Sequence, residues 1–267
     1  LRRPMSGRRA LFFDVDGTLM GYGGYVPESA KDAIRQVRER GALVFINSGR
    51  IHQLAKYIEN YVEADGLLCG CGTDLYLGQQ NLYRFLVDAD VLREIEDECL
   101  KDQADLVLEG PEGVAVAPWC RISETLSVME FIERQDAVWR GDFYDPAYAV
   151  NKFCLQYDSR TDIASFVQCA GKHFDIIDRG HGFYECVPLG HGKAFAIKKI
   201  MELCDIDLDD VYAFGDSTND LDMIKLAKHA VVMGQHDREL EPYAEFITTD
   251  LEDDGIANAM RHYGLIP

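Results

Sequence analysis

The sequence has few positive charges for its length. Its 267 residues include 27 Lys and Arg against 46 Asp and Glu, which gives a formal net charge of −19 at pH 7. Proteins that bind a phosphate backbone carry stripes of Lys and Arg, and this sequence contains no such stripe. We therefore expect no nucleic-acid partner. A small phosphorylated ligand fits this charge only if a metal ion and a few cations create a local positive pocket.

Long hydrophobic runs are also missing. The run Ala42–Ile46 is among the longest, whereas a membrane span needs roughly 18 or more apolar residues. Four arginines, Arg2, Arg3, Arg8 and Arg9, lead directly into a short strand-like run, and this start is not typical of a signal peptide. We expect a soluble, cytoplasmic protein with no membrane partner, either a monomer or a small homo-oligomer.

Closely paired cysteines are lacking as well. Eight cysteines are scattered along the chain without Cys-x-x-Cys spacing. Only Cys69 and Cys71 are near neighbours, and the alternation of side chains along a strand would place both on one face. Buried thiols in a reducing compartment explain this pattern better than a zinc site does.

What the sequence does contain is an alternation of strands and helices at both ends. A buried strand is predicted at 9–13, a helix at 28–40, a strand at 43–46 and a helix at 51–61. The same alternation returns in a second series: helix 192–203, strand 211–214, helix 219–228, strand 230–233 and helix 253–263. This order predicts an α/β fold with a doubly wound, mostly parallel, Rossmann-like core, whose ligands bind beyond the carboxyl ends of the strands.

The middle of the chain has a different pattern. Alternating runs such as 149–157 indicate strands, and helical stretches are expected near 88–101 and 161–172. We interpret this region as an inserted α+β domain. The predicted boundaries are 5–80 for the first part of the core, 81–187 for the insertion and 188–267 for the second part of the core.

Acidic residues follow the first predicted strand. Asp14 and Asp16 are two positions apart in an extended segment and can converge beyond the strand end. Two carboxylates would repel each other, and a hard divalent cation with oxygen ligands would relieve that repulsion and attract phosphate; Mg²⁺ fits best. The alternative is a solvated Asp-Gly turn. An EF-hand is excluded, because Gly17 is the fourth residue from Asp14 rather than the sixth.

Three further strand ends or helix starts carry polar groups. Asp216 follows another apolar strand, with Asn219 and Asp220 close by, although these two could equally cap a helix. Ser48, Gly49 and Arg50 open a helix with a hydroxyl and backbone amides, which suits either phosphate binding or simple capping. Lys193 is not part of a P-loop, since the required glycine and Ser/Thr are absent. It is a candidate cation for a phosphate, as is Arg50.

Taken in order, four segments resemble the motifs of the haloacid dehalogenase superfamily: Asp14-Val-Asp-Gly-Thr18, Ser48, Lys193 and Gly215-Asp-Ser-Thr-Asn-Asp220. The tail resembles the Cof-like sugar-phosphatase branch through Asp222-Met223, Val232-Met-Gly234 and Glu252-Asp-Asp-Gly-Ile256. About thirty residues separate Asp16 from Ser48, whereas nearly 145 separate Ser48 from Lys193. Only the second interval has room for a cap domain, and the α+β insertion there resembles a type IIB cap.

The resemblance implies a role for each matching residue. Asp14 would attack phosphorus to give an aspartyl-phosphate, and Asp16 would protonate the leaving oxygen and later activate water. The implied metal ligands for Mg²⁺ are the Asp14 carboxylate, the Asp16 carbonyl and Asp216. The implied phosphate-binding groups are Ser48, the Gly49 amide, Lys193 and Asn219, with support from Thr18, Arg50 and Asp220.

The resulting expectation is a magnesium-dependent phosphomonoester hydrolase that acts on small phosphorylated metabolites, in particular sugar phosphates. The acid at Asp16 disfavours dehalogenation, because dehalogenases of the superfamily lack an acid there. Two alternatives stay open: a phosphosugar mutase or phosphotransferase, and a non-catalytic protein that binds a phosphorylated metabolite.

Overall fold

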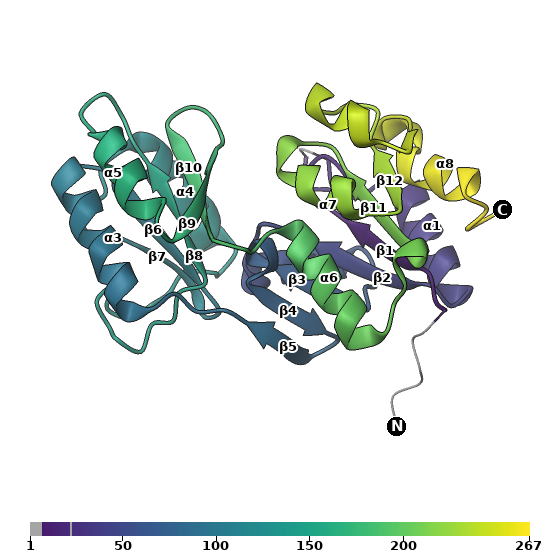
Figure 1. Cartoon of the computed structure of the whole chain (residues 1–267), viewed down its shortest axis with the longest axis horizontal. Coiled ribbons are helices and arrows are strands. Elements are labelled where there is room, and N and C mark those ends of the chain that lie inside the picture. The colour runs from purple at the N-terminus through teal and green to yellow at the C-terminus, as the bar shows by residue number, and fades with distance from the viewer. Residues whose placement is uncertain (1–6, 22) are drawn as a thin grey trace. The chain divides into compact units, whose positions relative to one another are not determined.

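The computed structural model describes residues 7–21 and 23–267 (Figure 1). Arg2, Arg3 and the first two residues of the predicted core segment 5–80 lie outside the described residues. The chain divides into two compact units: the first runs to Gly49 and includes 55–82 and 192–267, and the second comprises 50–54 and 83–191. Each unit is described by itself below.

An eight-stranded sheet forms the centre of the first unit, in the order β13-β12-β11-β1-β2-β3-β4-β5. Its strands are β1 (Ala10–Phe13), β2 (Leu43–Asn47), β3 (Gly66–Cys69), β4 (Asp74–Leu77), β5 (Gln80–Arg84), β11 (Val211–Gly215), β12 (His229–Val232) and β13 (Phe246–Ile247). All pairings from β13 to β3 are parallel, and β4 pairs antiparallel with β3. The predicted doubly wound, mostly parallel sheet is confirmed.

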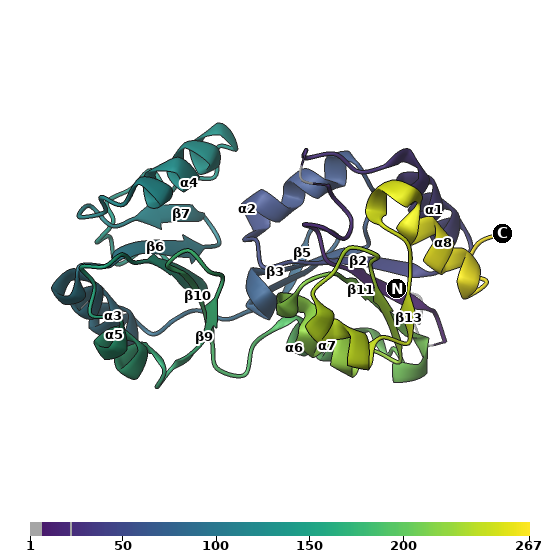
Figure 2. The ribbon, with the colours of Figure 1, turned by 90° about the horizontal axis from the view of Figure 1, so that it is seen from above.

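Helices cover both faces of this sheet. Helices α1 (Glu28–Glu39) and α8 (Gly255–His262) pack together on one side, and α6 (Lys193–Cys204) and α7 (Leu221–Leu226) pack together on the other (Figure 2). All four residues of β1 are completely buried, as expected for a strand covered on both faces. The predicted helix 51–61 is shorter: α2 (His52–Ala55) is followed by a 3-10 helix, Lys56–Asn60.

The second unit is built on an antiparallel sheet with the order β7-β6-β8-β10-β9. Its strands are β6 (Asp105–Gly110), β7 (Gly113–Val116), β8 (Lys152–Gln156), β9 (Phe174–Asp178) and β10 (Phe183–Pro188). Helices α3 (Ala89–Asp102) and α5 (Ile163–Ala170) cover one face, and α4 (Ser123–Arg134) lies on the other (Figure 2). The sequence pattern did not predict α4, because its apolar residues Leu126, Val128 and Phe131 are exposed and obscure the helical periodicity.

The expectation that Cys69 and Cys71 lie on one face of a strand is wrong. Cys69 ends β3, and Cys71 lies in the following turn with φ 53°, so the two residues do not share a strand face. All eight cysteines lie among the described residues and carry thiols rather than disulfides. Among residues 7–21 and 23–267, no helix has both the length and the apolar character needed to cross a membrane.

Candidate active site

Three neighbouring strands of the first unit end at the same edge of the sheet. Strand β1 pairs in parallel with both β2 and β11 (Figure 1), so the residues that follow these strands, Asp14, Ser48 and Asp216, emerge together. The backbone amide of Asp14 also donates to the carbonyl of Phe214 at 3.0 Å. From β1 the chain proceeds outward to β2 and later, in the opposite direction, to β11, and such a reversal of strand order is where doubly wound sheets bind ligands.

Lys193 lies between two carboxylates at this edge. Its Nζ donates to Asp14 Oδ1 and, at 2.5 Å, to Asp220 Oδ1. The three residues are almost completely buried: Lys193 is 2% exposed, Asp14 4% and Asp220 0%. Burial alone would lower the pKa of Lys193, but the charges of Asp14 and Asp220 outweigh it and raise that pKa well above its usual value. Lys193 is therefore a permanent buried cation.

The loop that carries Asp216 is held by hydrogen bonds from both sides. Thr18 Oγ1 donates to Asp216 Oδ1 at 2.6 Å. Asp220 Oδ2 accepts from the backbone amides of Asp216, at 3.0 Å, and Ser217, at 3.2 Å. Gly17 has φ +91°, and a Cβ added to it would lie 2.4 Å from Asp216 Oδ2. Only glycine combines this backbone conformation with such a close approach.

The carboxylates of Asp14, Asp216 and Asp220 form the candidate metal site. Each offers an oxygen, and these oxygens all lie within 4.8 Å of one another. Burial, followed by the charge of Asp220, raises the pKa of Asp14 to about 8, and burial raises the pKa of Asp216 to about 6. Lys193 alone thus leaves this group short of positive charge. A hard divalent cation would favour the ionised carboxylates, and the all-oxygen donor set fits Mg²⁺.

The remaining predicted site residues occupy several places. Asp16 is exposed, and its carboxylate is not in the group above. Ser48 is buried; its amide donates to Leu68 O at 2.8 Å, and its carbonyl accepts from the Cys71 amide. Gly49 ends this segment of the first unit, whereas Arg50 is assigned to the second unit. Asn219 is half-buried, and its Oδ1 accepts from Ser217 Oγ at 2.6 Å.

Sequence reasoning missed three residues that hold these groups in place. Asn47 Nδ2 donates to the Lys193 carbonyl at 3.0 Å, and Asp222 Oδ2 accepts from the Ala194 amide at 2.9 Å, so both tie down the start of α6. Asp237 Oδ2 accepts from the Thr218 amide, and its own amide donates to the Asp216 carbonyl, both at 2.8 Å. Asp222 lies in a segment that carries the family resemblance, although no role was predicted for it, and Asn47 adjoins Ser48, but nothing in the sequence marks Asp237.

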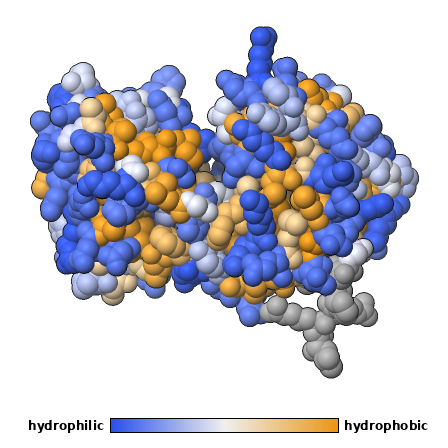
Figure 3. All heavy atoms as spheres, viewed as in Figure 1, coloured by the Kyte–Doolittle hydropathy of each residue, from blue (hydrophilic) through white to orange (hydrophobic). Residues whose placement is uncertain are grey.

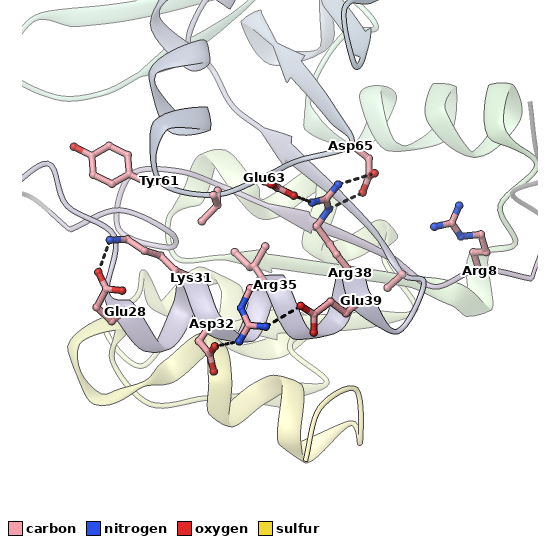
Figure 4. A pocket seen from close by; sticks show the side chains of 13 residues that line it. Arg8, Glu28, Lys31, Asp32, Arg35, Arg38, Glu39, Tyr61, Glu63 and Asp65 are labelled. Atoms are coloured by element: carbon pink, nitrogen blue, oxygen red, sulfur yellow. Dashed lines mark hydrogen bonds and ion pairs between the residues drawn. The ribbon is translucent and has the colours of Figure 1, made fainter.

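A cavity of about 720 Å³ in the first unit is not at this edge. Four cations line it, but Figure 4 shows that three are already matched by nearby acids: Lys31 by Glu28, Arg35 by Asp32 and Glu39, and Arg38 by Glu63 and Asp65. Such neutralised cations do not favour an anionic ligand. A smaller cavity of about 280 Å³ reaches Gly17 and Asp216 instead.

Comparisons with known proteins agree over most of the chain. A family model described as haloacid dehalogenase-like hydrolase matches residues 11–260. The chain is 28% identical over 262 residues to YkrA of Bacillus subtilis (strain 168), to which a phosphatase activity is ascribed; the match covers 97% of this chain and 98% of YkrA. It is 25% identical over 266 residues to YcsE of the same organism, named a 5-amino-6-(5-phospho-D-ribitylamino)uracil phosphatase, covering 96% of each chain.

A solved structure of a protein called a HAD subclass IIB sugar phosphatase, BT4131, has the same fold. It superposes with a TM-score of 0.80 and 23% identity, over 97% of this chain and 100% of that one.

Proposed function

We propose that this chain, which belongs to the haloacid dehalogenase-like hydrolase family and is a phosphatase of that family, hydrolyses phosphomonoesters of small metabolites, sugar phosphates in particular. The proposed reaction requires Mg²⁺ and proceeds through an aspartyl-phosphate. The observation that carries this proposal is the buried group around Asp14, where one fixed cation, Lys193, meets three convergent carboxylates. The substrate class is supported by the phosphorylated metabolite in the name of YcsE and by the name of BT4131.

The proposed reaction has two steps. In the first, an Asp14 carboxylate oxygen attacks phosphorus, the bond from phosphorus to the ester oxygen breaks, and Asp16 gives its proton to the departing alkoxide. In the second, Asp16 takes a proton from water, the resulting oxygen attacks phosphorus, and the Asp14–phosphorus bond breaks to release phosphate. The exposure of Asp16 suits a group that must reach both the leaving oxygen and water.

Several protein groups would stabilise the negative charge that develops on the phosphoryl oxygens. Lys193 supplies a buried cation that needs no rearrangement, because Asp14 and Asp220 already fix its Nζ. The Ser48 hydroxyl, the Gly49 amide and Asn219 complete the proposed phosphate-binding set, and Thr18, Asp220 and Arg50 support it.

The proposed ligands of Mg²⁺ are the Asp14 carboxylate, the Asp16 carbonyl and Asp216. When bound, the ion would neutralise the phosphoryl charge and lower the pKa values that burial, together with the neighbouring carboxylates, raises at Asp14 and Asp216. Thr18 and Gly17 keep the Asp216 carboxylate at the site, through the hydrogen bond and the close approach described above.

The nucleophile assignment is tested by Asp14→Asn. The amide is a poor nucleophile, so Mg²⁺-dependent release of phosphate from p-nitrophenyl phosphate should disappear, while Asp16→Asn should lose roughly 10²- to 10⁴-fold in rate. Asp209→Asn serves as a matched control, because Asp209 is exposed in the same unit and should leave the rate unchanged. Full activity in folded Asp14→Asn would refute the assignment. A panel of phosphorylated metabolites, assayed with and without an added sugar acceptor, tests the substrate class and separates hydrolysis from transfer.

A further inference from the structure

A third cavity lies entirely within the second unit, between one face of α3 and the loop 143–150, and has a volume of about 560 Å³. This size is typical of sites for small organic ligands. Its lining is mainly apolar and aromatic: Leu86, Val87, Ala89, Leu92, Phe143, Tyr144, Pro146, Ala147, Tyr148, Ala149 and Val150. Leu86 is 46% exposed and Tyr144 58% exposed, so apolar surface is accessible there. Figure 3 shows apolar side chains at the surface of the second unit among polar ones.

The α3 face that lines the cavity adjoins the face that builds the core, because Leu92 is half-buried and packs against that core. Ile95 and Cys99 of α3 are buried against the sheet and α5. The cavity is lined instead by helix positions at the spacing of a second face: Ala89, Leu92, Arg93, Glu96 and Asp97. Beside the edge of the core at Leu92, this face brings two carboxylates, Glu96 and Asp97, to the cavity.

The opposite wall is a loop that its own hydrogen bonds keep in shape. The amides of Tyr144 and Ala147 donate to the carboxylates of Asp142 and Asp145, at 3.0 and 2.9 Å, in two successive Asx turns. The Val87 amide donates to the Val150 carbonyl at 2.8 Å, and this bond joins the end of the loop to the segment that precedes α3. These three hydrogen bonds fix the backbone of the loop that forms this wall.

One half-buried carboxylate in this cavity, Glu96, forms no ion pair with a described residue. Glu96 makes no hydrogen bond or ion pair among the residues the structure describes, and its pKa is raised by burial and by the neighbouring Asp97, which outweigh the opposing charge of Arg93. The one positive side chain of the lining, Arg93, is exposed and bonded to Asp90. The polar groups of the cavity thus leave a net negative charge.

We propose that this cavity binds a small organic ammonium ion that carries an apolar or aromatic group. The ammonium would pair with Glu96 and lie against the rings of Phe143 and Tyr144, since aromatic rings attract cations through their π faces. The apolar group would fill the space between Leu92, Val87 and Val150. A phosphorylated substrate would be repelled by the same carboxylates, so this ligand is chemically different from the substrate of the phosphatase.

The proposal is tested by isothermal titration calorimetry of the full chain with phenethylammonium chloride and with its neutral analogue 2-phenylethanol. Phenethylammonium should bind, and the neutral analogue should bind about tenfold more weakly or worse. Glu96→Gln should remove most of the difference in affinity between phenethylammonium and 2-phenylethanol, and Tyr144→Ser should reduce this difference. Glu130→Gln removes the same charge from an exposed position on α4 and should leave binding unchanged.

Three results would overturn the proposal. They are no binding of phenethylammonium at about 10 mM, equal affinity for the ammonium and the alcohol, and equal weakening by Glu96→Gln and Glu130→Gln. The last result would mean that the cation responds to the overall charge of −19 rather than to this cavity. Thermal unfolding of each variant shows that the comparison is made between folded proteins.

Discussion

Glu185, at the centre of a buried charge cluster in the second unit, should contribute strongly to stability. Its Oε1 accepts from Lys152 Nζ at 2.9 Å and its Oε2 from Arg179, while Lys152 also pairs with Glu109 at 2.6 Å. Glu185 is 6% exposed and Lys152 2%. Burial alone would raise the pKa of Glu185, but Lys152 and Arg179 lower it from 4.5 to about 2. The folded protein therefore strongly favours the ionised carboxylate.

The size of the effect follows from this difference in pKa. Since each pKa unit corresponds to about 1.4 kcal/mol, the difference between 4.5 and about 2 is worth about 3 kcal/mol of folding free energy at pH 7. Because the folded pKa is depressed, this contribution is fully present above the unfolded pKa of 4.5 and is lost as the pH falls toward 2. At pH 3.5 about 2 kcal/mol should remain. Glu185→Gln should lower the free energy of unfolding by about 3 kcal/mol at pH 7 and by less in acid.

Tryptophan fluorescence during urea unfolding measures this effect selectively. The chain has two tryptophans, Trp119 and Trp139, and both lie in the second unit, so their signal reports the unfolding of that unit. Glu130→Gln, at an exposed position, should stay within about 0.5 kcal/mol of the wild type. A loss for Glu185→Gln below about 1 kcal/mol, or a loss that does not shrink between pH 7 and pH 3.5, would refute the reasoning.

Three other predictions follow from the described contacts. Gly17→Ala should abolish Mg²⁺-dependent activity, because the added Cβ would displace the Asp216 carboxylate. Gly41→Ala is the control: Gly41 has a similar φ of +92°, but no atom lies within 4 Å of the added Cβ, so the variant should lose stability and keep its activity. Asp237→Ala should raise the Mg²⁺ concentration needed for half-maximal activity about tenfold, because Asp237 positions the Asp216 loop. The Mg²⁺ concentration that gives half of the ion-induced rise in melting temperature should increase by the same factor. Unchanged concentrations would contradict this positioning role. Native protein should react slowly with a thiol reagent at pH 8, because burial raises the pKa of the two least buried thiols, Cys120 and Cys169, to about 12 and about 11. All eight thiols should react after unfolding, and rapid labelling of the folded chain would contradict this prediction.

The core could be predicted because its signals are local. Runs such as 9–13 and 43–46 are apolar throughout, which is typical of strands covered on both faces, and each ends at a polar residue that opens a turn or helix. The second unit was predicted less completely. Helix α4 exposes Leu126, Val128 and Phe131, so its hydrophobic pattern does not reveal which face is buried.

The sequence motifs predicted which residues form the candidate site, but they did not predict the contacts between those residues. Asp14, Lys193 and Asp220 are separated by 179 and 27 residues, and no spacing rule predicts that one Nζ bonds both carboxylates. Cys71 was misplaced because alternation was assumed to continue past Cys69, where the strand in fact ends in a turn with positive φ. Asp237 has an ordinary sequence context, and only its bonds to Thr218 and Asp216 distinguish it.

The sequence by itself determined the fold class, the family resemblance and the chemistry available at Asp14, because strand periodicity and short motifs are encoded within a few neighbouring residues. Only the tertiary structure decided which charges are neutralised and which are not. Lys193 is fixed between two buried acids, Lys31, Arg35 and Arg38 are matched by acids, and Glu96 makes no ion pair among the described residues. Electrostatic energies depend on distance and burial, and residues far apart in the chain acquire both only when the sheet and its helices assemble.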